Sequence, residues 1–379
     1  MAAEASSVAS LAEVIIWAEG VVTELRAGWH GAAELIVERR DGGSCRALAY
    51  TDLVAVPRVG DRVLLNVAAL DRGLGTGGYA LVVAVTDGNG QLTGQPPAPA
   101  GHLVKARYLP LQAMVAGADE QGSPYHETLA EADDVEALPV VVADLHSAVP
   151  AILAALRHDR PELRVVYVMS DHGALPLAFS RSVAQLAEAG WIAGTVTVGQ
   201  AFGGDLEAVN VHSGLLAAKL ALGADVAILT QGPGNLGTGT RWGFSGVACG
   251  EAVNAAAVLG GRPIGSLRIS AADPRPRHRG VSHHSLTAYG RVALLPADIA
   301  VPVFTGSLAG LGTQIEAEVR TLVRHRLHRV GLDGLLDALA ASPVRLSSMG
   351  RGLTEDPGYF LGAAAAGRLA ARMIEPGLR

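Results

Sequence analysis

Hydrophobic residues in the first 86 positions fall into short runs that predict β-strands. Gly and Asp turns separate the runs, and the segment PRVGDRVLLNV places the turn Gly60–Asp61 directly before one of them. Small barrels of the SH3 or translation-factor type contain this kind of hairpin. The predicted strands are Val14–Val22, Ala33–Glu38, Cys45–Tyr50, Val63–Val67 and Tyr79–Val85. We therefore predict a small SH3-like β-barrel over residues 1–86.

From Val140 onward the apolar runs alternate little with polar residues, and helical stretches separate them. Strands buried on both faces and alternating with helices are typical of a parallel, doubly wound sheet. The predicted strands are Val140–Leu145, Arg164–Met169, Ile192–Val198, Asp225–Thr230 and Ile264–Ile269. The predicted helices are Pro150–Leu156, Leu177–Ala189, Leu215–Leu222, Cys249–Leu259, Thr313–His328 and Asp356–Met373. This pattern predicts an α/β fold.

The segment DGNGQLTGQPPAPAG, residues 87–101, is rich in Gly and Pro and lacks periodicity, so it predicts a linker. The chain is then organised as a barrel over 1–86, this linker, and an α/β domain with C-terminal helices over 102–379.

Polar residues gather after the predicted strands of the α/β domain. Ligands bind beyond the carboxyl ends of the strands in open parallel sheets. The strand ends carry Asp144 and His146, then Asp171 and His172, then Gln200, Asp205, Asn210 and His212, then TQGPGNLGTGTRWGFSG, and last SAADPRPRHRGVSHHS. The sequence therefore predicts a binding site at this edge of the sheet.

Asp144 and His146 are two residues apart, so both side chains leave the same side of an extended strand. That spacing suits a pair of metal ligands, or a carboxylate that orients a histidine acting as general base. The alternative is that Asp144 caps the next helix and His146 packs in the core. Asp171 is open to the same two interpretations, as a member of the site or as a helix cap.

His283 and His284 are adjacent and would point apart in an extended segment, so that at most one would face the cleft unless the backbone kinks. With Arg275, Arg277, His278 and Arg279 they form a cationic stretch. That stretch either covers an anionic ligand or is a solvated surface.

The glycine-rich stretch after Thr230 is formally G-x-G-x-x-G, but no acidic residue stands about 20 residues on, as a dinucleotide fold requires. It also lacks the G-K-[ST] of a P-loop and the spacing of a nucleophile elbow. Amides before a helix can still hold a phosphate or carboxylate. The predicted anion-binding residues are Gly232, Gly234, Asn235, Gly237, Thr238, Gly239, Thr240 and Arg241.

Two further stretches carry candidate chemistry. We interpret His325 and His328 as cations at a helix C-terminus, where they complement the helix dipole. This interpretation is favoured over a pair of metal ligands. Residues 347–352, SSMGRG, are open to interpretation as a second anion-binding turn or as a helix start.

Composition and charge limit the kinds of molecule that the protein is expected to bind and the compartment in which it is expected to occur. The 379 residues are 49% apolar with a net charge of −6, which argues against nucleic acid, because nucleic-acid binding calls for a basic surface. Cys45 and Cys249 predict free thiols in a reducing compartment. The N-terminal stretch lacks the basic region of a signal peptide, and charge or glycine interrupts every long apolar run. These features predict a cytoplasmic protein without a membrane partner.

Several phrases resemble a bacterial family catalogued as a domain of unknown function, number 3866. They include VVADLHSAVPAIL, GTVTVGQAFGGDLEAVNVHSGL, QGPGNLGTGTRWGFSGV, RGVSHHSLTAYGRVAL and SSMGRGLTEDP. The resemblance extends from about Val14 to the C-terminal helix and implies that barrel and α/β part belong to one unit. It implies no activity and no catalytic residue.

We predict from these features a protein that binds a small anionic molecule at the carboxyl edge of the sheet, with metal- or His-assisted hydrolysis as the favoured reaction. The predicted catalytic residues are His146, Asp171, His283 and His284, and Asp144 with His146 is the candidate pair for a divalent metal. No nicotinamide, flavin or pyridoxal signature is evident. The alternatives are a recognition or assembly protein that uses the barrel, and a homo-oligomeric structural protein.

Overall fold

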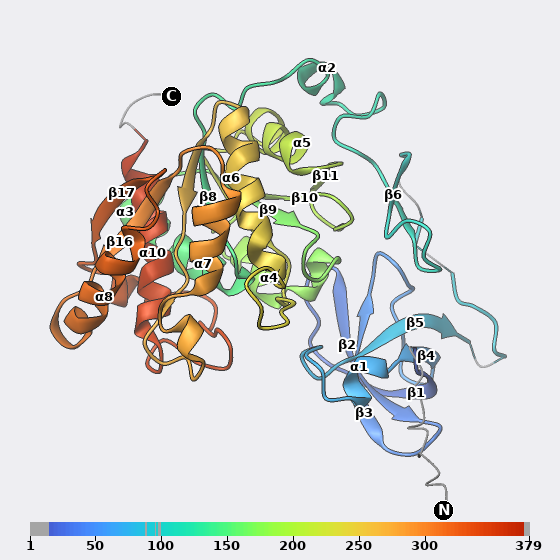
Figure 1. Cartoon of the computed structure of the whole chain (residues 1–379). Coiled ribbons are helices and arrows are strands. Elements are labelled where there is room, and N and C mark those ends of the chain that lie inside the picture. Colours follow the sequence, from blue (N-terminus) through green and yellow to red (C-terminus); the bar gives the residue numbers. More distant parts are fainter. Residues whose placement is uncertain (1–14, 88, 95, 98–99, 375–379) are drawn as a thin grey trace, which may run out of the picture. The chain divides into compact units, whose positions relative to one another are not determined.

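The computed structural model describes residues 15–87, 89–94, 96–97 and 100–374. The chain divides into two compact units, Met1–Pro97 and Ala98–Arg379. The first carries a β-barrel and the second a parallel sheet with interleaved helices (Figure 1). Within the described part of the chain, no helix combines the length and apolar character needed to cross a membrane.

Five strands close the predicted barrel in the order β1-β2-β3-β5-β4. All neighbours are antiparallel except β3 and β5, which are parallel. Alternate residues such as Leu35 and Val37 point inward and are fully buried, as the alternating pattern predicts. The strands are β1 (Trp17–Leu25), β2 (Ala32–Arg39), β3 (Ser44–Tyr50), β4 (Arg62–Asn66) and β5 (Ala80–Thr86), with the short helix α1 (Ala68–Asp71). The predicted start of the first strand at Val14 lies outside the described residues.

Eight strands of the second unit form one all-parallel sheet in the order β11-β10-β9-β12-β8-β13-β16-β17. Its central strands are buried on both faces, which explains their continuous apolar runs. The strands are β8 (Pro139–Ala143), β9 (Val165–Ser170), β10 (Gly194–Thr197), β11 (Leu206–Glu207), β12 (Val226–Gln231), β13 (Arg262–Gly265), β16 (Asp298–Val303) and β17 (Arg326–Gly331). The predicted doubly wound α/β fold is confirmed, with three strands more than the five predicted.

Helices cover both faces of this sheet because its connections run in two directions. The connection from β8 to β9 crosses the sheet one way and the connection from β12 to β13 crosses it the other way. Right-handed crossovers then place α3 (Val149–Asp159) and α6 (Ala248–Val258) on opposite faces. In Figure 1, α5 (Val211–Leu216), α6 and α7 (His283–Thr287) lie in front of the sheet. α3 packs against α9 (Leu335–Ala340) and α10 (Pro357–Arg372) on the other face.

The predicted helix Thr313–His328 is wrong in its second half. α8 (Ala309–Val319) ends early, and β17 takes up the residues from Arg326. Arg326 and His328 alternate along β17, and both bond to the buried carboxylate of Asp298 on β16. Arg326 and His328 therefore pair with a neighbouring strand and do not stand at a helix C-terminus, and His325 is buried with its ring bonded to the backbone of Ala297 and Tyr289.

The remaining elements are short. They are α2 (His126–Leu129), α4 (Arg181–Glu188), and the two-stranded pairs β6 (Leu103–Lys105) with β7 (Ala113–Val115) and β14 (Ile269–Ser270) with β15 (Gly280–Val281).

Lys105 fixes β6 to the edge of the sheet. Its ammonium is 2% exposed and donates to the carbonyls of Gly199, Ala201 and Ala208. The carboxylate of Glu207 on β11 lies 3.4 Å from it. A buried ammonium requires this set of acceptors, because an unpaired buried charge is costly.

We expect Lys105→Met to lower the free energy of unfolding by about 3–5 kcal/mol, because Glu207 and three carbonyls lose their buried partner. Urea unfolding followed by circular dichroism measures the change. Lys219→Met is the matched control, since Lys219 pairs with the exposed Glu136 and such a pair contributes less than about 1 kcal/mol. A Lys105→Met variant as stable as Lys219→Met would contradict the assignment.

Candidate functional site

The direction of the connections changes at the carboxyl end of β8. The chain leaves β8 toward α3 on one face, whereas the chains that leave β12 and β13 lead to the other face. Neighbouring strands whose connections diverge in this way leave a crevice at their carboxyl ends. The segment between β13 and β16 reaches this crevice and carries three histidines.

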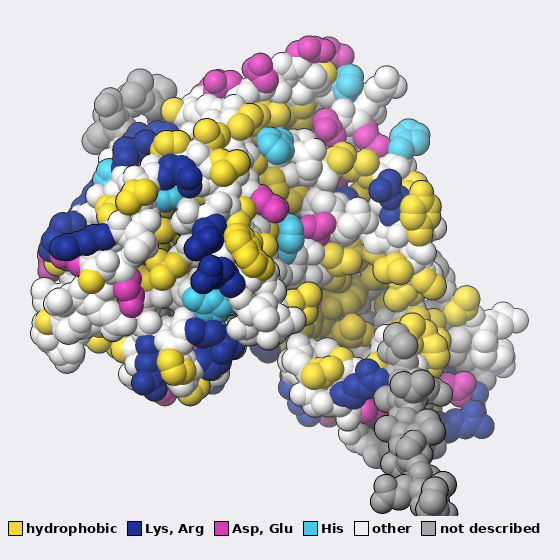
Figure 2. All heavy atoms as spheres, in the orientation of Figure 1, with side chains coloured by type: hydrophobic (Ala, Val, Ile, Leu, Met, Phe, Trp, Pro, Cys, Tyr) yellow, Lys and Arg dark blue, Asp and Glu magenta, His cyan; other side chains and the backbone are white. Residues whose placement is uncertain are grey.

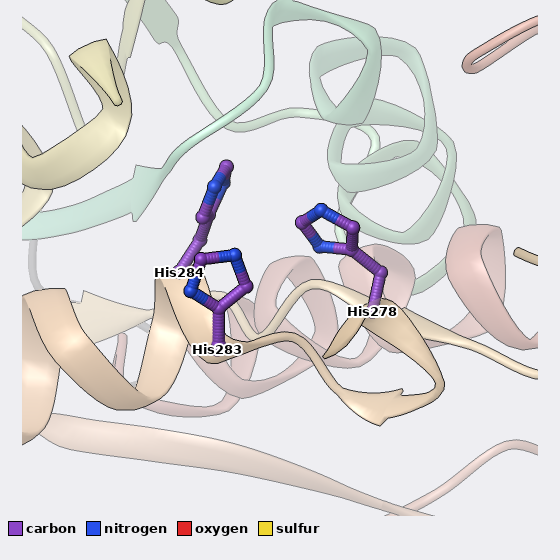
Figure 3. Close-up of side chains that lie close together, drawn as sticks. All are labelled: His278, His283 and His284. Atoms are coloured by element: carbon purple, nitrogen blue, oxygen red, sulfur yellow. The ribbon is translucent and has the colours of Figure 1, made fainter. Parts of the chain in front are cut away.

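His278, His283 and His284 form what we call the histidine cluster. Each ring offers one nitrogen, and these three nitrogens lie within 4.8 Å of one another. Figure 3 shows the three rings side by side, with His283 and His284 on one segment and His278 on the preceding turn. His278 and His284 are buried and His283 is partly buried. Three imidazole nitrogens at this separation are a candidate metal site.

The local sequence explains how adjacent histidines reach one cluster. The hydroxyl of Ser282 caps α7 by accepting from the backbone N–H of His284. His283 and His284 therefore stand in the first turn of a helix and not in an extended segment. This helical turn is the change of backbone direction under which both side chains can lie on the same side. The Ser282 hydroxyl also bonds to Nδ1 of His278 at 2.7 Å.

Phe244 forms the wall behind the cluster. Its ring stacks on that of His284 with centroids 3.7 Å apart and an interplanar angle of 4°. Phe244 belongs to the segment after β12, so the glycine-rich loop ends against the histidine cluster.

A buried ion network lies behind the histidines. Arg268 is 5% exposed and lies 3.8 Å from Asp144 at the end of β8 and 3.8 Å from Asp273. Asp273 also pairs with Arg275 and Arg351, and Arg351 forms a second ion pair with Asp356. Three aspartates thus balance three arginines, which is the condition for burying so much charge.

The surroundings keep two of the histidines neutral. Burial, together with Arg268 and Arg275, lowers the pKa of His278 to about 3. Burial, together with His284 and Arg277, lowers the pKa of His283 to about 4. Arginine and lysine side chains gather around histidines near α7 on the face that Figure 2 shows. Neutral imidazoles are the form that binds metal ions.

Asp144 lies beside the histidine cluster. Its Oδ2 lies 3.5 Å from Nδ1 of His284, is buried, and has no hydrogen-bond partner among the described residues. Nε2 of His283 is a second buried atom without such a partner in the described part of the chain. Nε2 of His283 would gain a partner if the cluster held a metal ion.

His146 turns away from Asp144. β8 ends at Ala143 and a 3₁₀ turn starts at His146, so the extended geometry assumed for this pair does not hold. Nε2 of His146 lies 2.6 Å from Ser180 Oγ, and Nδ1 lies 2.9 Å from the hydroxyl of Tyr167. The tyrosine in turn bonds to Thr230. Burial lowers the pKa of His146 to about 4. These contacts place His146 in a separate polar group between β8, β9 and β12.

Asp171 stands at the end of β9 with its carboxylate accepting from the backbone N–H of Gln200, in the loop that leads to β11. Its neighbour His172 lines a cavity of about 200 Å³ between α5 and α6. Asn210, His212 and Asp144 line the same cavity. Ser245 and Gly246 of the glycine-rich stretch also line it, so four of the predicted strand ends meet there, whereas Asp171 lies beside the cavity and not in the histidine cluster.

The glycine-rich loop does not lead straight into a helix. Gly237 bridges to Phe244, Thr238 N–H donates to the Gly243 carbonyl, and α6 begins only at Ala248. These backbone groups therefore form hydrogen bonds within the loop. Thr240 and Arg241 at its tip are exposed.

Close packing of the backbone explains some of the glycines in this loop. A side chain at Gly232 would collide with the backbone of Ala174, in the loop after β9. At the other end, a side chain at Gly246 would press on Asp144. The loop thus lies tightly against both neighbouring strand ends.

Sequence patterns do not single out Arg268, Asp273 and Phe244. Each has an ordinary local explanation, and only the fold shows that they surround His284. The charge of Arg268 inside the apolar run SLRIS was the available signal, because a buried arginine requires a partner.

A family model described as "Protein of unknown function (DUF3866)" matches residues 46–367, which is most of the chain. Comparison with curated proteins and with solved structures finds no match.

We expect the pH dependence of stability to report on His146. Its folded-state pKa of about 4 lies below the unfolded value of 6.5, so the unfolded chain takes up the proton first as pH falls. This difference lowers the free energy of unfolding progressively between about pH 6.5 and pH 4, by about 3 kcal/mol in total. Urea unfolding of His146→Gln across this range should show a smaller slope than the native chain. The exposed His212→Gln is the control, and equal slopes for both variants would contradict the prediction.

Proposed function

The chain belongs to the DUF3866 family, and we propose that it holds a divalent transition-metal ion on His278, His283 and His284 and hydrolyses a small anionic ester there. The observation that carries the proposal is the histidine cluster itself, three imidazoles from one short segment brought together at the carboxyl edge of the sheet. Three protein ligands leave a coordination position for water or substrate. An ion so held lowers the pKa of bound water and polarises an ester oxygen.

The hydrogen bonds around the cluster suit this ligand set. Nδ1 of His278 donates to Ser282 Oγ in the metal-bound form, which directs Nε2 of His278 toward the ion. Nε2 of His283 takes the ion as its partner. Nδ1 of His284 accepts from the guanidinium of Arg268 at 3.3 Å and lies 3.5 Å from Oδ2 of Asp144, so these two side chains together orient the ring.

The charge around the cluster is compatible with a cation. Arg268 alone would repel a metal ion, but Asp144 and Asp273 flank its guanidinium and balance it. The low pKa values of His278 and His283 also mean that protons compete weakly for these two nitrogens at neutral pH.

The surroundings supply places for an anionic substrate. Arg277 is exposed and lies near Gly239 at the tip of the glycine-rich loop, so its guanidinium and the exposed Thr240 and Arg241 can hold an anionic group. The cavity of about 200 Å³ that Asp144 lines offers space for the organic part. In hydrolysis, the oxygen of one water joins the electrophilic centre, the bond to the leaving oxygen breaks, and that oxygen receives a proton.

We expect the purified full chain, reconstituted with Zn²⁺ at pH 7.5, to retain about one ion per chain by mass spectrometry, as a three-histidine site predicts. His283→Ala and His278→Ala should weaken Zn²⁺ binding at least ~100-fold in competition with a chelating dye, because losing a ligand exceeds the ~10–100-fold effect of losing an outer partner.

His172→Ala is the matched control, because His172 lies at the same edge of the sheet but outside the cluster. Thermal melting of each variant checks that the fold is kept. A native chain that retains no Zn²⁺, or a His283→Ala variant that binds as tightly as His172→Ala, would overturn the proposal.

A further inference from the structure

A second cavity lies at the same edge of the sheet, between the ends of β8 and β12. Its volume is about 290 Å³, just under the range of about 300–1,000 Å³ for drug-sized ligands, so it suits a small molecule or a single anionic group. Its polar lining includes Ser147, Ser182, Gln231, Asn235, Arg345 and Ser348. No residue of the histidine cluster lines it.

The start of α3 gives this cavity a positive end. Ser147, in the 3₁₀ turn before the helix, and Pro150, in its first turn, both line the cavity. The 3₁₀ turn continues directly into α3, so the positive partial charge of the helix dipole lies at this turn. The Ser147 hydroxyl bonds to Ser348 and to Tyr359, which holds the turn 347–350 against the helix start.

Asn235 presents a donor. Ser245 Oγ accepts from the N–H of Leu236 and donates to Oδ1 of Asn235. Nδ2 of Asn235 is then left buried without a partner among the described residues. A buried N–H group in a cavity wall is a binding group for an anion.

Gln231 presents a fixed acceptor. Its Nε2 donates to the backbone carbonyl of Asp144 at 2.6 Å, so its orientation is determined. Gln231 is 4% exposed, and its Oε1 is buried without a partner in the described part of the chain. An acceptor at this place favours an anion that itself carries a proton.

We infer that this cavity is a binding site for inorganic hydrogen phosphate, which still carries a P–OH group at neutral pH. Arg345 and the start of α3 supply positive charge, and Asn235 Nδ2 donates to a phosphate oxygen. Ser182 and Ser347, which also line the cavity, supply hydroxyl donors. The P–OH group donates to Oε1 of Gln231. Sulfate has the same shape and carries no proton at neutral pH, so the site discriminates against it.

Titration calorimetry of the full chain without added metal tests this site with inorganic phosphate and with sulfate at pH 7. We expect phosphate to bind with a Kd below about 1 mM and sulfate at least ~10-fold more weakly. Asn235→Asp keeps the acceptor for Ser245 and replaces the donor by a carboxylate, so it should abolish binding. Arg345→Gln should weaken it at least ~10-fold.

Two controls separate this site from others. Arg320→Gln removes the same charge from the exposed C-terminal end of α8 and should leave binding unchanged. His283→Ala should also leave phosphate binding unchanged, because the site does not rest on the metal proposal. Absence of phosphate binding by the native chain, equal affinity for sulfate, or unchanged binding by Asn235→Asp would overturn the inference. A small phosphate monoester is mostly without a P–OH group at pH 7 and should therefore bind more weakly than inorganic phosphate, as sulfate does.

Discussion

The buried guanidinium of Arg268 is the interaction on which the edge of the sheet depends. It lies between Asp144, at the end of β8, and Asp273, in the segment after β13, and it contacts His284. A charge at 5% exposure needs both carboxylates. Since these groups come from two neighbouring strand ends, their pairing fixes the segment that carries the histidine cluster against β8.

The glycine-rich loop lies between the two candidate sites. Its first residues, Gly232 to Asn235, line the cavity at the start of α3, and its last part stacks Phe244 on His284. Contact with the loop after β9 through Gly232 holds it in place. The loop therefore lies between the histidine cluster and the cavity at the start of α3.

Much of the fold could be predicted from the sequence, and less of the candidate site. Runs such as Val226–Gln231 are apolar throughout because both faces of the strand are buried, and this pattern is visible without coordinates. The C-terminal region was harder to predict, because Arg326 and His328 fit the end of a helix as well as a strand. Only their contacts with Asp298 on the neighbouring strand distinguish the two. His283 and His284 were predicted as site residues, whereas their relation to His278 depended on where α7 begins.

The sequence by itself determined the barrel, the parallel sheet and the edge at which polar residues collect, because periodicity and strand-end position are local properties of the chain. Only the tertiary structure decided which of those residues meet. Asp144 and His146 are two positions apart, yet a change of backbone direction after Ala143 sends one to His284 and the other to Tyr167. Contacts between residues more than a hundred positions apart depend on strand order and helix packing, which no short stretch of sequence encodes.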